Sequence, residues 1–327
     1  MIITRTPLRV SFAGGGSDLH AYYQHEPGIV LSTAIDKYVY LAVKPHFDSN
    51  FRISYSKTEF ADTVEQIEHR LVRECLKLLG IDRGCEIVSM ADLPARTGLG
   101  SSSSFTVGLL HALYADQGKV VTPERLASEA CQMEIEKLGE PIGKQDQYIA
   151  AYGGLQMIQF NPDGSVFVNP VVCTIERRRQ LNERLMMFFV GGARDAREVL
   201  ARQKQNTGNK KEVLGRMCRI AHQLHDILTG TQDLGDFGLL LDEAWQAKKS
   251  LESSISNPAI DEYYARGLRA GATGGKLLGA GSGGFLLFYC EPEKQEEVRQ
   301  ELAELRELKF SFDGQGSKIV YIGSDPW

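Results

Sequence analysis

The chain has 327 residues, of which 43% are hydrophobic and 24% are charged, and its formal net charge is −5. This composition is typical of a globular protein with enough chain for two domains, and the negative charge argues against a general nucleic-acid binder. Six cysteines stand singly with no CxxC pair, so neither a zinc knuckle nor a disulfide framework is expected. The sequence starts without a signal-peptide core, and no apolar run is long enough to span a membrane, so a cytoplasmic protein is expected.

The first half of the chain alternates predicted strands and helices. In the first predicted strand, apolar residues alternate with arginine and serine, as in a half-buried strand. The helix expected over 122–139 carries clear end signals: Thr122 suits the N-cap, Pro123 the first turn and Gly139 the stop. The expected strands cover residues 3–13, 38–43, 51–56 and 85–94, and a further helix is expected over 64–80, closed by Gly80.

The second half predicts an α+β pattern. The charged stretch 176–184 is the best candidate for a boundary, so the predicted domains are residues 1–178 and 179–327. Strands are expected over 155–160 and 166–172, joined by a turn at 161–164, and then over 185–192, 284–290, 309–312 and 318–323, with a helix over 293–307.

Three glycine-rich segments stand out, at residues 13–18, 98–104 and 271–285. The third contains a formal GxGxxG match, but an apolar strand follows it where a dinucleotide site needs a helix, which argues against a nicotinamide-dependent oxidoreductase. The triplet Asp-Phe-Gly at 236–238 has no HRD-type loop before it, so a protein kinase is not indicated either.

The second segment, GLGSSSS at 98–104, opens directly into the apolar run FTVGLLHALY. Free N–H groups at a helix start attract anions, glycines let a phosphate approach the backbone, and serines add hydroxyl donors. One helix end contributes only about 0.3–1 kcal/mol toward an anion, so a nucleotide would need further ligands. Taken alone, the segment fits a phosphate loop and a serine-rich N-cap equally well.

Four charged residues are candidates for chemistry. Glu134 interrupts an apolar stripe on the helix over 122–139, so it needs a cation, a metal or another partner if it is buried. Its alternative is an edge position that reaches water. Asp146 is either a helix cap or a catalyst, Arg9 either an exposed strand residue or a site residue, and Asp18 either a turn former or a ligand.

Together these features resemble the GHMP kinases. PLRVSFAGGGSD is similar to the first motif of that family, LPARTGLGSSSS to its phosphate loop and KLLGAGSGGF to its third motif, in the family's order. The resemblance implies an α+β fold with an N-terminal α/β domain, a C-terminal ferredoxin-like domain and an active site between them. RTPLRVSFAGGGSD and GKQDQYIAAYGG most resemble the members that act on D-glycero-D-manno-heptose 7-phosphate, with L-fucokinase a close relative.

The resemblance also implies roles for individual residues. Asp146 would meet the acceptor hydroxyl, Arg9 would position Asp146, and Ser102 and Glu134 would bind Mg²⁺. The residues implied to wrap the ATP phosphates are Gly98, Leu99, Gly100, Ser101, Ser102, Ser103 and Ser104. The residues implied to contact the sugar are Asp18, Gly15 and Gly16, with Gly281, Ser282 and Gly283 closing the site from the second domain.

The implied reaction is ATP-dependent phosphorylation of the anomeric hydroxyl of a heptose, from the 7-phosphate to the 1,7-bisphosphate. A phosphorylated acceptor needs a cationic pocket, for which Arg5, Lys37, Arg194 and Arg197 are candidates, although exposed helix charges are an equal alternative. An L-fucokinase or a galactokinase-like enzyme is a rival, as is a catalytically silent regulator of the same fold. The expected partner is a small-molecule sugar or sugar phosphate, with no nucleic acid or membrane, and the expected state is a monomer or a homodimer.

Overall fold

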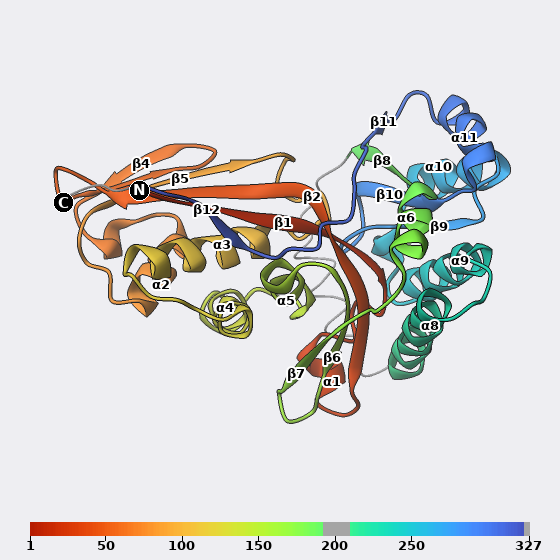
Figure 1. Cartoon of the computed structure of the whole chain (residues 1–327), viewed down its shortest axis with the longest axis horizontal. Helices are drawn as coiled ribbons and strands as arrows, with labels where there is room; N and C mark the ends of the chain where they lie inside the picture. Colours follow the sequence, from red (N-terminus) through yellow and green to blue (C-terminus); the bar gives the residue numbers. More distant parts are fainter. Residues whose placement is uncertain (192–209, 324–327) are drawn as a thin grey trace.

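Two long antiparallel strands, β1 (Ile2–Ala13) and β2 (Gly28–Pro45), form the spine of the larger of two sheets (Figure 1). The structure is a computed structural model that describes residues 1–191 and 210–323. Beyond β1, β2 pairs with two strands in succession: residues Gly28–Thr33 pair with β6, and residues Val39–Pro45 pair with β5. The long β2 therefore connects both halves of an eight-stranded sheet.

The path through this sheet is β12-β1-β2-β5-β3-β4, and β6 and β7 branch from β2. Strand β12 comes from the end of the chain, so the sheet contains segments from both halves of the sequence. Its remaining strands are β3 (Phe51–Ser54), β4 (Thr58–Ala61), β5 (Cys85–Ala91), β6 (Leu155–Phe160), β7 (Val166–Pro170) and β12 (Lys318–Ile322).

Helices α2 to α5 lie along one face of the first sheet, and α3 (Ser101–Asp116) packs directly against β1 and β2 (Figure 1). The inward side chains of α3, such as Leu109 and Leu113, are fully buried, which fixes its start beside the end of β1. The other helical segments of this part are α1 (His20–Tyr23), η1 (Val64–Gln66), α2 (Arg70–Leu78), α4 (Pro123–Cys131), η2 (Gln132–Lys137) and α5 (Gln145–Tyr152).

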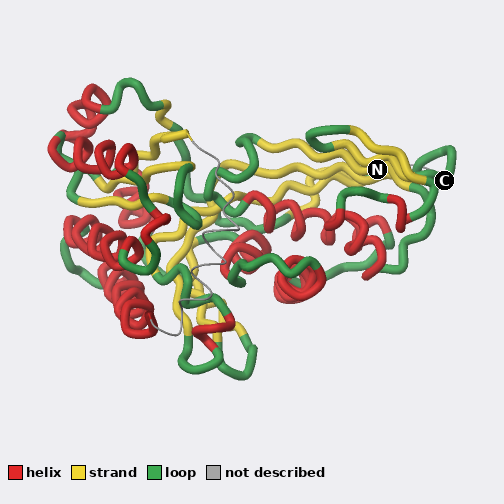
Figure 2. The backbone as a smooth tube through the Cα atoms, turned by 180° about the vertical axis from the view of Figure 1, so that it is seen from behind, coloured by secondary structure: helices red, strands yellow, loops and turns green. Residues whose placement is uncertain are grey.

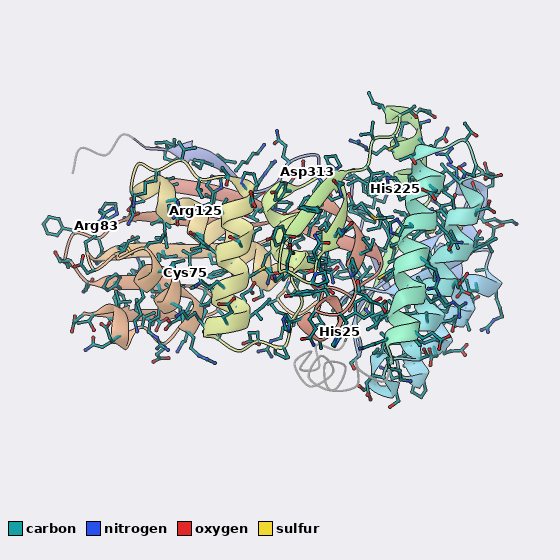
Figure 3. The ribbon with its side chains drawn as sticks, turned by 90° about the horizontal axis from the view of Figure 1, so that it is seen from below. His25, Cys75, Arg83, Arg125, His225 and Asp313 are labelled. Carbon is teal, nitrogen blue, oxygen red and sulfur yellow. The ribbon has the colours of Figure 1, made fainter. Side chains whose placement is uncertain are left out.

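The second part of the molecule is built on an antiparallel sheet with the order β11-β8-β10-β9. Seen from behind, its helices gather at one end of the elongated molecule (Figure 2). Arg83 lies near the opposite end, while His225 marks the helical end (Figure 3). The elements are α6 (Ile175–Glu183), β8 (Leu185–Gly191), α8 (Lys211–Thr229), α9 (Gly235–Lys249), η4 (Ser253–Ile255), α10 (Pro258–Arg269), β9 (Gly274–Leu277), β10 (Gly284–Tyr289), η5 (Pro292–Lys294), α11 (Gln295–Glu301) and β11 (Arg306–Glu307).

The structure confirms the α+β class and corrects several predicted elements. The helix expected over 64–80 is a short 3₁₀ turn followed by α2, because the side chain of His69 caps a new start by accepting from the Val72 amide. The helix expected over 293–307 ends at Glu301, and Arg306–Glu307 pair with β8 instead. Residues 309–312 form no strand and contribute one isolated bridge between Phe312 and Ile35.

Two corrections concern the site itself. The four serines predicted in a loop before the helix form the first turn of α3, because Gly100 adopts a φ of 76° and serves as its N-cap. The helix predicted over 122–139 begins as expected, with the Thr122 hydroxyl accepting from the Arg125 amide, but becomes π-helical over Gln132–Lys137. Such π segments are common at functional sites, and this one contains Glu134.

The two sheets meet where the glycine-rich segments converge. A Cβ atom on Gly279 would lie 2.4 Å from the Cα of Gly98, and one on Gly284 would lie 2.4 Å from the carbonyl oxygen of Thr97. The ammonium of Lys276 donates to the carbonyls of Ser11 and Phe12 at 2.7 and 2.8 Å, which ties β9 to the end of β1. The division at residue 178 stays a prediction.

This backbone contact generates a stability prediction. Gly279→Ala places a methyl group against Gly98 at a φ of +78°, whereas Gly118→Ala places one in open space at a φ of +70°. The left-handed backbone alone costs about 1–2 kcal/mol for a residue with a Cβ. We expect urea denaturation to show that loss for Gly118→Ala and a clearly larger loss for Gly279→Ala. Equal losses would show that the contact between the two glycine-rich segments contributes nothing to stability.

Candidate active site

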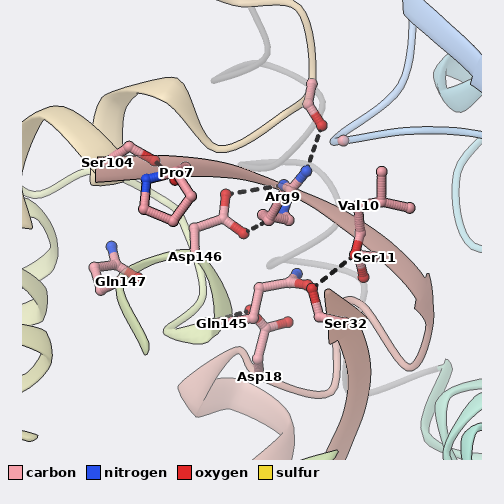
Figure 4. Close-up of polar contacts among 12 residues, drawn as sticks. Pro7, Arg9, Val10, Ser11, Asp18, Ser32, Ser104, Gln145, Asp146 and Gln147 are labelled. Carbon is pink, nitrogen blue, oxygen red and sulfur yellow. Dashed lines mark hydrogen bonds and ion pairs between the residues drawn. The ribbon is translucent and has the colours of Figure 1, made fainter. Parts of the chain in front are cut away.

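Arg9 and Asp146 form a bidentate ion pair at the junction of the two sheets (Figure 4). The Arg9 Nε and Nη2 groups donate to the two carboxylate oxygens of Asp146 at 2.8 and 2.9 Å, and Nη1 donates to the Gly98 carbonyl at 2.5 Å. Arg9 is only 5% exposed, so its guanidinium is held in one orientation. The pair links β1, the glycine-rich turn before α3 and the first turn of α5, and it places a carboxylate beside the start of α3.

Asp18 ends the first glycine-rich segment and lies on the other side of the site from the Arg9–Asp146 pair (Figure 4). One carboxylate oxygen accepts from the Gly16 amide at 2.8 Å, and the other accepts from the Gln145 amide at 3.2 Å. Burial nevertheless raises the pKa of Asp18 above its ordinary value, and the nearby Asp146 raises it further. Gly143 must be glycine here, because a Cβ atom would lie 1.9 Å from the Asp18 carboxylate.

The four serines divide their roles within the first turn of α3. Ser103 and Ser104 are buried, and the Ser104 hydroxyl donates to the Pro7 carbonyl at 2.7 Å. Ser101 and Ser102 are less buried, and the Ser102 hydroxyl donates to Glu134 at 2.8 Å. The backbone N–H groups at this helix start have no partner within the helix, which makes the turn a site for an anion such as a phosphate.

Glu134 is almost completely buried, at 1% exposed. Its second carboxylate oxygen accepts from the Gln147 amide at 2.6 Å, and no cationic side chain within the described ranges 1–191 and 210–323 forms an ion pair with it. Burial is the main reason that its pKa rises to about 7, against the lowering effect of the Ser102 and Gln147 hydrogen bonds. The apolar stripe that Glu134 interrupts in the sequence is therefore real, and the carboxylate is buried without a counter-charge.

Ser102 and Glu134 have chemistry that suits a magnesium site. Mg²⁺ prefers oxygen ligands, and the protein usually supplies only a few of them. Within the described part of the chain, no cluster of three or more His, Cys, Asp or Glu side chains could hold a metal. These two residues would therefore hold Mg²⁺ only together with oxygens from a bound phosphate. A cation at this point would also offset the buried charge of Glu134.

A pocket opens between the two sheets beside Asp18 and Asp146. Most of the predicted catalytic and sugar-contacting residues line it, whereas Ser102 and Glu134 are not part of its lining. The lining residues are Arg9, Ser11, Gly15, Gly16, Asp18, Leu19, Ile142, Gly143, Gln145, Asp146, Lys248, Lys276, Gly279 and Ala280. Gly281, Ser282 and Gly283 do not line it: Ser282 instead donates to the carbonyls of Ile255 and Ser254. Their predicted contact with substrate stays a prediction.

Two of the four cations predicted to hold a substrate phosphate, Arg5 and Lys37, lie outside this pocket. Arg5 stacks on the ring of Tyr38 and pairs with Asp313 at 3.6 Å, and Lys37 pairs with Asp36 at 2.8 Å. Neither Arg5 nor Lys37 lines the pocket. Arg194 and Arg197 lie outside the described residues.

Two buried lysines that the sequence analysis missed line the pocket instead: Lys248 at the end of α9 and Lys276 on β9. Lys248 continues the buried stripe of α9 through Leu241 and Trp245, the same signal that pointed to Glu134. Lys276 lies in the third glycine-rich segment, and no pattern around it in the sequence gave a reason to expect a site residue. The pocket therefore combines two carboxylates with three cationic side chains.

Comparisons with known proteins match both halves of the chain to family models. The family described as GHMP kinases N terminal domain matches residues 62–154, and the family described as GHMP kinases C terminal matches residues 210–307. A D-glycero-alpha-D-manno-heptose 7-phosphate kinase from Campylobacter jejuni is 29% identical over 96% of this chain and 97% of its own length. The match over residues 62–154 includes the glycine-serine segment at 98–104 and Asp146 of α5.

Two solved structures share the fold. A D-glycero-D-manno-heptose 1-phosphate kinase from Bacteroides thetaiotaomicron is 26% identical, with a TM-score of 0.77 over 99% of this chain and all of that one. A Streptococcus pneumoniae phosphomevalonate kinase, solved with phosphomevalonate and AMPPNP, is 17% identical, with a TM-score of 0.79 over 96% of this chain and all of that one.

The Arg9–Asp146 geometry predicts the effect of removing the carboxylate charge. Asp146→Asn keeps the shape of the side chain but removes the carboxylate expected to act as the base, so we expect turnover to fall about 10²–10⁴-fold, the usual contribution of a general base. Nucleotide binding, which is expected at the start of α3, should stay close to wild type. The measurements are steady-state turnover and titration with a non-hydrolysable ATP analogue.

The control for this variant is Asp226→Asn, an exposed aspartate on α8. It should match wild type in both measurements. Near-wild-type turnover in Asp146→Asn would remove Asp146 from the catalytic role.

Glu134 generates a prediction for metal dependence and for pH. Its folded-state pKa of about 7 exceeds the ordinary 4.5, so the native state holds the proton more tightly than the unfolded chain. This stabilising contribution is present at low pH and is lost as the pH rises through about 7. We expect Glu134→Gln to need far more Mg²⁺ for activity and to lose this pH-dependent part of the metal-free stability.

Thermal unfolding between pH 5 and pH 8 and a Mg²⁺ titration of activity test these effects. Glu136→Gln, an exposed neighbour in the same π-helical segment, is the matched control. An unchanged Mg²⁺ requirement in Glu134→Gln would exclude Glu134 as a metal ligand.

Proposed function

Because the chain belongs to the GHMP kinase family and is a sugar kinase, we propose that it phosphorylates the anomeric hydroxyl of D-glycero-D-manno-heptose 7-phosphate. The proposed phosphoryl donor is ATP with Mg²⁺, and the proposed product is the 1,7-bisphosphate. The observation that carries this proposal is the buried Arg9–Asp146 pair, which faces a polar pocket on one side and the start of α3 on the other.

In the proposed reaction, Asp146 takes the proton of the sugar hydroxyl while that oxygen bonds to the terminal phosphorus of ATP and the bond to ADP breaks. Arg9 holds both carboxylate oxygens in one plane, which orients the base and adds positive charge where negative charge is shared among the moving oxygens. Asp18, with Gly15 and Gly16 beside it, accepts hydrogen bonds from further sugar hydroxyls.

The proposed nucleotide site is the start of α3, Gly98 to Ser104, where Gly98 and Gly100 allow close approach, Ser101 to Ser103 present N–H groups, and Ser101 and Ser102 carry the less buried hydroxyls. The ATP analogue bound to the S. pneumoniae neighbour supports the choice of ATP. Bound Mg²⁺ would supply positive charge that offsets the negative charge of the phosphates. Ser102 and Glu134 are the residues proposed to hold it.

The choice of sugar rests on the relatives and on the charge of the pocket. The names of the two heptose kinase relatives differ in where the acceptor sugar carries its phosphate. It is at position 7 for the C. jejuni protein and at position 1 for the B. thetaiotaomicron protein. We propose the 7-phosphate, because Asp146 needs a free hydroxyl on the acceptor and the C. jejuni relative aligns over almost the whole of both chains.

We propose that this reaction takes place in the cytoplasm. All six cysteines are free thiols, and five of them are buried, as expected in a reducing compartment. Within the described residues, no helix could cross a membrane.

A catalytically silent regulator of the same fold is the rival of a different class. The contacts among Arg9, Asp146, Ser102 and Glu134 argue against it, because each buried charge is costly and serves no packing purpose that an apolar residue would not serve better. L-fucokinase and galactokinase-like activities remain rivals of the same class, and the acceptor panel separates them.

An ADP-release assay over a panel of acceptors tests the proposal. The panel holds heptose 7-phosphate, heptose 1-phosphate, free heptose, L-fucose and galactose, each with Mg-ATP. We expect the highest kcat/KM with the 7-phosphate and a new phosphorus signal at the anomeric carbon by NMR. Asp146→Asn serves as the background control.

A higher kcat/KM with L-fucose or galactose than with heptose 7-phosphate would identify that sugar as the substrate instead. Absence of ADP release with every sugar would favour the regulator instead.

A further inference from the structure

The end of helix α9 carries a buried ammonium that the proposed roles do not use. Lys248 is 7% exposed and lines the pocket together with Arg9, Asp18 and Asp146. It reaches this position from the second part of the molecule, opposite the strand that carries Arg9. Its adjacent residue, Lys249, points away: it pairs with Asp261 and lies over the ring of Trp245.

Lys248 has unused hydrogen-bonding capacity. An ammonium offers three donors, but within residues 1–191 and 210–323 Lys248 donates to the Gly279 carbonyl alone. No carboxylate in those ranges forms an ion pair with it. The other cations of the pocket are better satisfied, since Arg9 binds Asp146 and Gly98, and Lys276 binds two backbone carbonyls. A buried charge with so few partners is unfavourable unless a ligand completes it.

The charges around the pocket favour an anion. Three cationic side chains face two carboxylates there, and one carboxylate, Asp146, is fully engaged by Arg9. Asp18 already accepts two backbone N–H groups. Burial, together with the nearby charge of Arg9, lowers the pKa of Lys248 to about 8. An anionic group in the pocket would offset this repulsion among the cations.

Two buried polar atoms in the same lining also lack a partner among the residues that the structure describes. The Ser11 hydroxyl and the Gln145 side-chain carbonyl are shielded from solvent and make no hydrogen bond with any of those residues. A hydroxyl can donate to a phosphate oxygen, while an amide carbonyl can accept from a sugar hydroxyl. Buried polar groups are normally paired, so these atoms indicate a ligand that carries both an anionic group and hydroxyl groups.

We infer that Lys248 binds the phosphate that the acceptor sugar already carries and thereby makes the enzyme prefer phosphorylated over plain sugars. This inference rests on the proposed function in one respect, the phosphorylated acceptor. Lys248 lines the pocket with Asp18 and Gln145, whereas Ser101 to Ser104 are not part of that lining, which favours the acceptor over the phosphates of ATP. Lys248 thus replaces Arg5 and Lys37 as the cation expected for the substrate phosphate.

The test compares two acceptors in one protein. Lys248→Met keeps the length of the side chain and removes the charge, so we expect KM for heptose 7-phosphate to rise about 10–100-fold, the loss of a charge-assisted hydrogen bond. KM for free heptose should change far less, and the preference for the phosphorylated sugar should collapse. Lys248→Arg should recover part of it, and Lys249→Met, the same change one residue on, should leave the preference intact.

Two results would overturn the inference. A preference for the phosphorylated acceptor that is unchanged in Lys248→Met would show that Lys248 does not contact that phosphate. An equal loss with both acceptors, together with a raised KM for ATP, would place Lys248 on the phosphates of ATP. Thermal unfolding of each variant shows whether it is folded, and replacing a poorly paired buried ammonium by methionine should not lower the melting temperature.

A binding measurement separates this inference from the proposed function. Calorimetric titration with inorganic phosphate, with a non-hydrolysable ATP analogue filling the proposed nucleotide site, should show binding to the wild type and to Lys249→Met and a marked loss in Lys248→Met. Failure of the acceptor panel with heptose 7-phosphate would overturn the proposed substrate but leave this result standing. Equal phosphate binding by the wild type and Lys248→Met would overturn the role of Lys248 alone.

Discussion

The rest of the site depends on one ion pair, between the buried Arg9 and the partly exposed Asp146. Two hydrogen bonds join the pair, and a third bond from Arg9 reaches the Gly98 carbonyl, so three segments far apart in sequence are held in one arrangement. Removing Asp146 would leave the buried Arg9 guanidinium without its counter-charge, which is unfavourable. The pair therefore keeps a carboxylate at a fixed place relative to the first turn of α3.

Burial disfavours the charged form of three other groups near this pair. Burial raises the pKa of Asp18 and Glu134 and lowers that of Lys248, so in each case the charged form is disfavoured. The protein supplies each of them with hydrogen bonds but not with a full counter-charge. Clusters of such groups are typical of sites whose charges are completed by a ligand or a metal, and here Asp18 and Lys248 line the same pocket.

The glycine-rich segments serve the site in two different ways. Gly100 provides the left-handed turn that starts α3 and lies close to Arg9 and Asp146. Gly279 and Gly284 instead let the second sheet approach the backbone at Thr97 and Gly98, where any side chain would collide. The third segment therefore acts mainly as a packing surface, which explains why Gly281 to Gly283 do not line the pocket even though the motif pointed to the site.

Local patterns in the sequence predicted most strands of the first sheet, the start of α4 and the apolar stripe that Glu134 interrupts, while the family motifs pointed to Arg9, Asp18 and Asp146. These features depend on neighbours in the chain, on alternation, caps and helical stripes, and such signals can be read without knowing the fold. Only the tertiary structure decided that the four serines begin α3, that the segment around Glu134 is π-helical, and that Lys248 and Lys276 enter the pocket while Arg5 and Lys37 do not. Each of these outcomes depends on contacts between residues far apart in the sequence, such as Lys276 with Ser11 across the two sheets, and no local pattern encodes which distant partner a long charged side chain will meet.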